Sequence, residues 1–466
     1  MSGLPAPRRA TDGSTGRGAG GLDRVPLVPR ATLAETARVL TAVVAPLVAR
    51  GVILPRPAAL AVADRRDADR RVYRVLAALR ARYHGGPVRL AAPLGRFALP
   101  LSPDHARRVL AGSPEPFAPA TREKRAALAH FQPHGVLIST GEQRPVRRRL
   151  NETVLDTPSP VHRLGDTFAR KVADEAAALG DTLTWAGFHR VAGRIVRRVV
   201  LGDAAADDTR FTAVLDQLRD RANWAYLRPR RERLRHEFTA RLAGYAARAE
   251  PDSLMAVLAK TPAPPGADPV GQAPQWLFAF DSAAVATYRA LAVLAAHPEA
   301  LERARAEAAG DRLYRPYLRA CVLDAVRLWP TTQAILRDSL AETLWPAGRL
   351  PAGTSLLIIS SYFHRDPATV PFADRFTPEA WLDGRAASSG ALIPFSDGPG
   401  RCPGRNLVLL VAGTLLAEVI RDRRPVPAGG RRLFPEHLPA TLDHTALRLR
   451  LEPAPREISA APQGPR

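Results

Sequence analysis

The ten residues FSDGPGRCPG, at positions 395–404, contain Cys402, one of only two cysteines in a chain of 466 residues. Three of the ten are glycines, which permit positive φ and let the backbone approach another group closely. An apolar segment of helical character follows directly, at residues 406–420. A cysteine in front of a helix lies where backbone N–H groups and the helix dipole stabilise a thiolate. The stretch therefore predicts a thiolate bound to a large flat cofactor.

The spacing Phe-x-x-Gly-x-x-x-Cys-x-Gly in this stretch resembles the haem-binding loop of the cytochrome P-450 family. The resemblance implies that Cys402 is the axial thiolate ligand of a haem b iron and that Phe395 packs beside it. The family usually has Arg or His two residues before the cysteine, where the side chain binds a haem propionate. Here Gly400 holds that position, and Arg401 is the residue that we expect to compensate.

A second signature is Asp324-Ala-Val-Arg327. Residues three apart on a helix share a face, so the two side chains can pair; on a surface such a pair is worth only a few tenths of a kcal/mol. The resemblance implies that it stands for the family's buried Glu-x-x-Arg, which joins a second arginine, here Arg375, to brace the cysteine loop. Because Asp is one methylene shorter than Glu, we expect looser bracing.

The pattern of apolar residues predicts a long helix over residues 275–296. The resemblance aligns Asp281 and Ser282 on this helix with the family's acid–alcohol pair, which relays protons during catalysis. The alternative is that Asp281 is a buried helix acid paired with a nearby arginine. Phe278 stands where the family has a small residue, and its bulk either narrows the pocket or packs outward.

Three arginines are candidate partners for the haem propionates, because a guanidinium suits a carboxylate. Arg337 matches a family propionate position, and Arg144 and Arg148 resemble the family's His/Trp-x-x-x-Arg at a helix start. The alternative for each of them is a solvated surface arginine.

The resemblance implies a mainly helical P-450 fold with small β-sheets, in which haem lies between the long helix and the cysteine loop. We expect a disordered N-terminal arm at residues 1–30, a single domain over residues 31–455 and a flexible tail at residues 456–466. We expect residues 115–141 to form a long irregular connection that lines a pocket.

A formal net charge of +22 raises the question of nucleic-acid binding. The arginines are spread along the whole chain and no nucleic-acid motif is present, so we expect no nucleic-acid partner. Two cysteines are too few for a disulfide framework or a CxxC zinc site. No secretory signal is evident, and the longest mostly apolar run, residues 407–420, is too short to span a bilayer. We therefore expect a cytoplasmic protein without a membrane span.

The resemblance implies a monooxygenase that inserts one oxygen atom from O2 into an organic small molecule, such as a secondary metabolite. No flavin or iron–sulfur motif is present, so we expect electrons from a ferredoxin and a ferredoxin reductase. One alternative is a peroxide-using or coupling haem-thiolate enzyme. Another, of a different class, is a degraded haem-binding accessory protein, which the changes at Asp324, Gly400 and Phe278 suggest.

Overall fold

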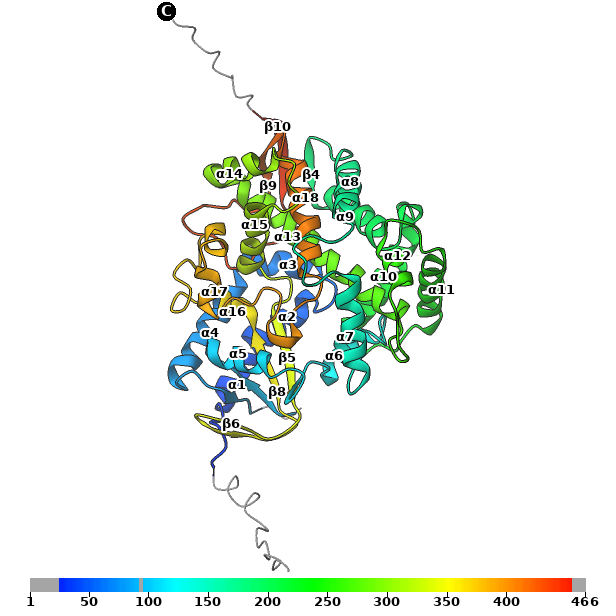
Figure 1. The fold of residues 1–466 in the computed structure, drawn as a ribbon. Coiled ribbons are helices and arrows are strands. Elements are labelled where there is room, and N and C mark those ends of the chain that lie inside the picture. The colour runs from blue at the N-terminus through cyan, green and yellow to red at the C-terminus, as the bar shows by residue number, and fades with distance from the viewer. Residues whose placement is uncertain (1–24, 92–94, 455–466) are drawn as a thin grey trace, which may run out of the picture.

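A computed structural model describes residues 25–91 and 95–454 (Figure 1). Residues 1–24 of the expected arm and the whole expected tail lie outside the described residues. The last part of the arm, residues 25–30, is ordered, contrary to expectation. Val28 is fully buried, and its N–H donates to the carbonyl of Arg349 at 3.1 Å. Backbone bridges also join Leu27 to Arg349 and Arg30 to Arg89, so two distant segments hold this stretch in place.

Helices make up most of the described chain. In the first half they are α1 (Leu33–Val39), α2 (Ala45–Arg50), α3 (Pro57–Arg65), α4 (Ala68–Arg82), α5 (Pro103–Ala111), α6 (Arg122–Leu128), α7 (Gln143–Val154), α8 (Gly165–Ala176), α9 (Trp185–Val200) and α10 (Thr209–Ala222). In the second half they are α11 (Glu232–Arg248), α12 (Leu254–Lys260), α13 (Ala273–Ala295), α14 (Pro298–Ala308), α15 (Pro316–Leu328), α16 (Ser360–Arg365), α17 (Arg385–Ser389) and α18 (Arg405–Ile420).

The strands form three small sheets. They are β1 (Val88–Arg89), β2 (Phe97–Leu99), β3 (Phe117–Ala118), β4 (Thr182–Thr184), β5 (Ala334–Ser339), β6 (Thr343–Trp345), β7 (Gly348–Leu350), β8 (Ser355–Ile359), β9 (Arg423–Gly429) and β10 (Arg448–Pro453). The largest sheet has the order β1-β2-β8-β5-β3, with only the β2–β8 pair parallel. The other two have the orders β4-β10-β9 and β6-β7. The expected fold class, mainly helical with small sheets, is confirmed.

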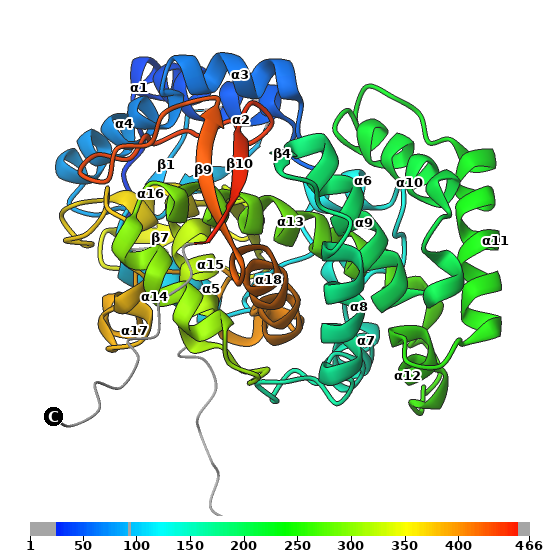
Figure 2. The ribbon, with the colours of Figure 1, turned by 90° about the horizontal axis from the view of Figure 1, so that it is seen from above.

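Helix α13 lies at the centre of the molecule and packs against α9, α15 and α18 (Figures 1 and 2). It is long and apolar enough to cross a membrane, and within the described residues only its segment Val270–Ala295 meets that test. Because 78% of its most apolar window is buried inside the protein, the helix forms the core. Helix α18 is buried on nearly all sides and also packs on α8, so the residues just before it are held beside the core.

The expected irregular connection at residues 115–141 is more ordered than the sequence suggested. It contains β3, helix α6 and a 3-10 turn at Val136–Ile138. The Thr121 hydroxyl accepts the Lys124 N–H at 3.3 Å and caps α6. This short helix packs against α10, and the cap fixes its first turn beside β5.

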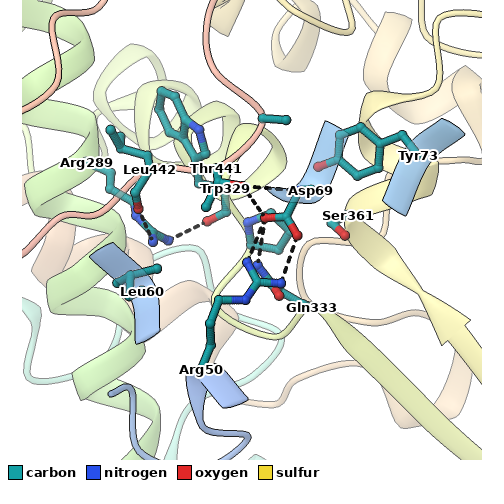
Figure 3. A pocket seen from close by; sticks show the side chains of 12 residues that line it. Arg50, Leu60, Asp69, Tyr73, Arg289, Trp329, Gln333, Ser361, Thr441 and Leu442 are labelled. Carbon is teal, nitrogen blue, oxygen red and sulfur yellow. Dashed lines mark hydrogen bonds and ion pairs between the residues drawn. The ribbon is translucent and has the colours of Figure 1, made fainter. Parts of the chain in front are cut away.

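A buried polar cluster ties the N-terminal helices to the core (Figure 3). Arg50 of α2 donates two hydrogen bonds of 2.8 Å to Asp69 of α4, and Asp69 also accepts the Thr441 hydroxyl at 3.0 Å. Arg289 of α13 lies beside them and donates to the carbonyls of Trp329 and Leu442 at 2.9 and 3.0 Å. The cavity between these groups measures only about 10 Å³, the space of a single water. The cluster therefore joins elements and leaves no room for a larger ligand.

Candidate active site

The cysteine loop is a closed turn in front of helix α18. The Cys402 N–H donates to the carbonyl of Phe395 at 2.9 Å, and the Arg401 N–H donates to the carbonyl of Gly398 at 3.0 Å. Gly398 has φ of +61°, and a Cβ there would stand 2.4 Å from the carbonyl oxygen of Leu110 at the end of α5. Only glycine suits this position, because the loop passes so close to α5.

The environment of Cys402 does not favour a thiolate in the protein alone. Burial raises the pKa of the Cys402 thiol, and the opposing effects of the Gly404 N–H and of the Arg148 and Arg405 charges are smaller. The expectation from the helix N-terminus is therefore wrong for the protein without a metal, because the loss of hydration outweighs the dipole. A metal ion bound to the sulfur would supply the missing positive charge and favour the thiolate.

Two of the predicted arginines serve the loop itself. Arg148 of α7 donates to the carbonyl of Arg401 at 2.8 Å and to Glu152 at 2.6 Å. The Arg401 side chain is exposed and forms an ion pair with Asp397. It therefore does not compensate for Gly400, because it leaves the loop on the solvent side. Both guanidinium groups thus interact with the loop or with a neighbouring acid.

Arg337 and an unpredicted residue, Lys124, converge on one carbonyl group. The Leu336 oxygen accepts from Arg337 Nη1 at 2.9 Å and from Lys124 Nζ at 3.0 Å. Burial first, and then the charge of Arg144, lowers the pKa of Arg337 to about 10. Burial, followed by the charges of Arg337 and Arg144, lowers the pKa of Lys124 well below its ordinary value. The Lys124 cation is therefore destabilised by both arginines, and the Arg337 cation by Arg144.

We call Lys124, Arg144 and Arg337 the cation cluster. Arg144 and Arg337 are buried, and Arg144 Nη1 donates to the carbonyl of Val136 at 2.8 Å. In residues 25–91 and 95–454 none of the three forms an ion pair with a carboxylate, although buried charges are usually paired. The cluster fits a group that brings its own negative charges. Sequence reasoning found the two arginines and missed Lys124, for which the sequence holds no signal.

Gly400 belongs to the same region. A Cβ on this residue would stand 2.9 Å from Arg337 Nη2. Arg337 Nε donates to the Ser113 hydroxyl at 2.8 Å, and Nη2 lies 3.4 Å from the hydroxyl of Ser396 in the loop. Arg337 of β5 therefore occupies the space beside the loop that a side chain at position 400 would take.

Asp324 and Arg327 of α15 form an ion pair with no solvent exposure. Arg327 Nε and Nη2 lie 2.5 and 3.1 Å from the two carboxylate oxygens, and Asp324 also accepts the Thr377 N–H at 2.7 Å and the Trp381 indole N–H at 3.0 Å. Four donors therefore hold the shorter acid. The expectation of loose bracing is wrong, because the surrounding segment 377–381 approaches the aspartate.

The second arginine of the brace is not Arg375. Its side chain is exposed, and only its carbonyl takes part by accepting from Arg327 Nη2 at 2.5 Å. Arg365 of α16 is the buried arginine here: it pairs with Asp374 and donates to the carbonyls of Leu328, Leu438 and Pro439. The sequence analysis did not single out Arg365 as a partner in this brace.

Asp281 of α13 pairs with an arginine, which agrees with the alternative interpretation of this residue as a helix acid held by an arginine. Arg219 of α10 forms an ion pair with Asp281 Oδ2, and His189 Nε2 of α9 lies 3.7 Å from Oδ1. Burial favours the neutral acid, but the charges of Arg219 and His189 outweigh it and lower the pKa of Asp281. Neither partner was recognised from the sequence, where both are single polar residues in helical patterns.

The neighbours of Asp281 mark the place where α13 is not fully packed. Residues 278, 279 and 282 are partly exposed, whereas nearly all residues from 283 to 294 are buried. The Ser282 hydroxyl has no hydrogen-bond partner within the described part of the chain. The Phe278 ring lies 5.9 Å from the Phe131 ring and 5.1 Å from the Arg219 guanidinium, so it packs toward the segment after α6.

Comparison with known protein families covers most of the elements described above. The family model described as cytochrome P450 matches residues 278–429, which include the brace, Arg337 and the cysteine loop. The matched segment belongs to the cytochrome P450 family. The family implies a haem cofactor, and the cation cluster beside the cysteine loop fits it, because haem brings two propionates to three cations that lack an anion.

Curated relatives resemble this P450 over part of its length. The cyclooctat-9-en-7-ol 5-monooxygenase of Streptomyces melanosporofaciens is 33% identical over 150 residues, which are 29% of this chain and 32% of the relative. The taurochenodeoxycholic 6 alpha-hydroxylase of Sus scrofa is 34% identical over 170 residues, covering 32% of this chain and 34% of the relative. The chain thus spans about a third of the length of the curated relatives that it matches.

Solved structures share the fold of this P450 over most of its length. The crystal structure of CYP108D1 from Novosphingobium aromaticivorans has a TM-score of 0.66 at 18% identity and covers 92% of this chain and 100% of that one. The retinoic acid bound cyanobacterial CYP120A1 has a TM-score of 0.66 at 17% identity, covering 80% and 93%. At this level of identity the likeness concerns the fold.

Proposed function

We propose that this P450 is a haem-thiolate monooxygenase that inserts one oxygen atom from O2 into an organic small molecule. The observation that carries the proposal is the pairing of Cys402, in a closed turn at the start of α18, with the cation cluster next to that turn. A thiolate ligand and an anion site so placed suit a cofactor that has a metal at its centre and carboxylates at its edge.

The residues that would hold haem b follow from this arrangement. Cys402 would bind the iron, Phe395 would pack beside the sulfur, and the cation cluster would hold the propionates. A haem with a thiolate ligand supplies the activation of dioxygen. The chain supports the loop from two sides: the buried brace of Asp324 and Arg327 ties down the segment 373–381, and Arg148 holds the carbonyl before the cysteine.

Proton handling falls to Asp281 and Ser282 in this proposal. The lowered pKa of Asp281 favours its ionised form, and the Ser282 hydroxyl beside it along the helix has no hydrogen-bond partner within the described residues. An ionised carboxylate accepts a proton, and a neighbouring hydroxyl passes one on, because it both donates and accepts. The partly exposed stretch 278–282 gives both groups access to the space beside α13.

The substrate and the partners are proposed by chemistry. The partly exposed ring of Phe278 on α13 packs at a tilt on the buried Phe131 ring, and this apolar surface favours a substrate with an apolar body. The relatives named taurochenodeoxycholic 6 alpha-hydroxylase and cyclooctat-9-en-7-ol 5-monooxygenase support an organic small molecule as the substrate. Electrons would come from an acidic ferredoxin and its reductase, because the exposed Arg401 and the positive net charge attract an acidic donor. A cytoplasmic location suits these soluble partners.

The ferrous–CO spectrum tests the haem-thiolate assignment. Wild-type protein loaded with haem should give the band of a thiolate-ligated haem, and the variant Cys402→Ala should lose that band while retaining the circular dichroism of a folded helical protein. Absence of the thiolate band in the wild type would rule out the assignment.

Turnover assays distinguish the monooxygenase from the peroxide-using enzyme. Product formation with NADPH, ferredoxin and reductase supports the monooxygenase, whereas turnover with hydrogen peroxide alone supports the peroxide-using enzyme. Asp281→Asn should impair only the first route. Spectral shifts on substrate binding with no turnover by either route would favour the accessory protein.

A further inference from the structure

The carboxylate of Asp281 is divided between two partners of different chemistry. Oδ2 pairs with the Arg219 guanidinium, and Oδ1 lies 3.7 Å from Nε2 of His189. A guanidinium keeps its protons at every physiological pH, so Arg219 holds the carboxylate in place and cannot supply a proton. An imidazole gains and loses a proton near neutrality, so only His189 is able to do so.

The ring of His189 is held at this distance by its own helix. The Trp185 ring, one turn earlier on α9, lies 4.9 Å from the His189 ring at an interplanar angle of 31°. The Trp185 ring also contacts the rings of Tyr288 of α13 and of His444, with ring centroids 5.6 and 4.5 Å apart. The side chain of His189 is nevertheless 38% exposed, so water reaches the imidazole while the stacking fixes its orientation.

The charges around His189 balance only when the imidazole is protonated. Asp281 and Asp216 contribute two negative charges, and Arg219, whose Nη1 also lies 3.2 Å from Asp216 Oδ1, contributes one positive charge. The interaction with Asp281 raises the pKa of His189. Burial, followed by the charge of Asp281, raises the pKa of Asp216. Both shifts have the sign expected for a cluster that lacks one positive charge.

Other charged groups near α9 do not take this role. His444 on the side of Trp185 stays neutral, because burial and then the Arg289 charge lower its pKa to about 2. The acids that α8 and the turn Asp203–Ala205 direct at α9 are taken by other arginines: Glu175 pairs with Arg194 and Arg198, and Asp203 pairs with Arg198. Helix α12 carries a single ionisable residue, the exposed Lys260, and β4 carries none.

We propose that His189 is a positioning residue that holds Asp281 and resupplies it with protons from solvent during dioxygen-dependent turnover. The inference deepens the proposed function and rests on it. In the transfer, the N–H bond at Nε2 breaks and an O–H bond forms at Oδ1. The imidazole becomes neutral and takes a proton from water, and no electrons are transferred. Arg219 keeps the carboxylate oriented throughout.

The pH dependence follows from the sign of the shift. His189 is protonated below its raised pKa, so proton supply operates there and is lost as the pH rises through that value. Dioxygen uptake by the haem-loaded enzyme, driven by NADPH with a plant-type ferredoxin and its reductase, should therefore fall on the alkaline side at the midpoint of the His189 titration.

The first test is an NMR titration of His189 in the full-length protein, assigned by its absence in His189→Gln. The midpoint should lie above that of an ordinary histidine in the wild type and should fall in Asp281→Asn. An unchanged midpoint in Asp281→Asn would overturn the inference, whatever the activity.

The second test compares dioxygen uptake across pH. His189→Gln should lower the rate on the order of tenfold and remove the alkaline limb. Peroxide-driven oxidation of a phenolic dye should be unaffected, because peroxide carries its own protons. His236→Gln, at an exposed position of α11, is the matched control and should behave as the wild type does.

The outcomes separate the two proposals. Dioxygen uptake by His189→Gln with the rate and pH profile of the wild type would overturn the role of His189 and leave the monooxygenase standing. If the wild type takes up no dioxygen, the proposed function fails and the proton-supply role fails with it, even where the NMR titration shows the pair.

Discussion

Arg337 Nη2 lies 2.9 Å from the point where a Cβ on Gly400 would stand. The cysteine loop and strand β5 thus compete for one space, and in this chain the strand's arginine holds it. Gly400 therefore matches the position of the Arg337 guanidinium, which a side chain in the loop would displace.

Gly400→Arg should displace the Arg337 guanidinium and weaken haem retention. The double variant Arg337→Ala/Gly400→Arg should retain haem better than either single variant, because the new arginine then meets a vacated space. We expect a coupling energy of about 1–3 kcal/mol, measured by haem transfer to apomyoglobin. If the losses of haem retention in the two single variants simply add in the double variant, the two side chains do not compete for one space.

Asp324→Glu should destabilise the protein, although it restores the residue usual in the family. Four donors already surround the shorter carboxylate, so an added methylene overpacks the site at a cost of about 1–3 kcal/mol. Asp324→Asn should cost more, about 3–5 kcal/mol, because Arg327 is left buried without its counter-charge. Urea unfolding of the haem-loaded protein measures both, with Asp104→Glu at an exposed site as the control. A glutamate variant as stable as the wild type would show that the site is not tightly filled.

Gly398→Ala should lower haem retention and the thermal midpoint together. The residue has φ of +61° and faces the backbone of α5, so the new methyl group meets atoms that cannot yield. Gly404→Ala, at the other end of the loop, is the matched control, because its Cβ would find the nearest atom at 3.8 Å and its φ is −86°. We expect a loss of more than about 1 kcal/mol for the first variant and little for the second. Equal losses would mean that the loop tolerates neither.

His364 should make the protein sensitive to acid. Burial, followed by the Arg327 charge, lowers the pKa of His364 from 6.5 to about 3, and the neutral Nε2 accepts the Ile393 N–H at 3.0 Å. Between these two values the unfolded chain binds a proton that the folded protein does not, so stability is complete above pH 6.5 and falls as the pH falls.

The slope from this residue is about 1.4 kcal/mol per pH unit. His364→Gln should remove that part of the slope, measured by urea unfolding between pH 7 and pH 5. The exposed His236→Gln should leave the slope unchanged. A wild-type stability that is flat across this range would contradict a buried neutral histidine.

The sequence allowed the fold class and the loop at Cys402 to be predicted, because both depend on local patterns. Helix α13 was expected at residues 275–296 and lies at Ala273–Ala295, since its apolar run is long and a proline ends it on each side. The pair of Asp324 and Arg327 follows from helical spacing alone. Short elements such as α6 and α12 escaped prediction because seven residues carry too little periodicity.

The site was harder to predict wherever it depends on contacts between distant segments. Lys124 meets Arg337 across more than two hundred residues of chain, and Arg219 meets Asp281 across two helices. Arg375 was assigned to the brace from a motif, but its side chain is exposed, and only its carbonyl accepts a hydrogen bond from Arg327. The departures at Gly400 and Asp324 looked like weaknesses because the compensating groups come from elsewhere in the fold.

The cation cluster has a consequence for biosynthesis. Until a negatively charged group arrives, three positive side chains repel one another at the junction of α6, α7 and β5. This repulsion destabilises the native state without its cofactor, and ligand binding to the native state alone adds stability by mass action. The amount of active protein in a producing cell should thus follow the supply of haem, and a cell starved of it should degrade the chain.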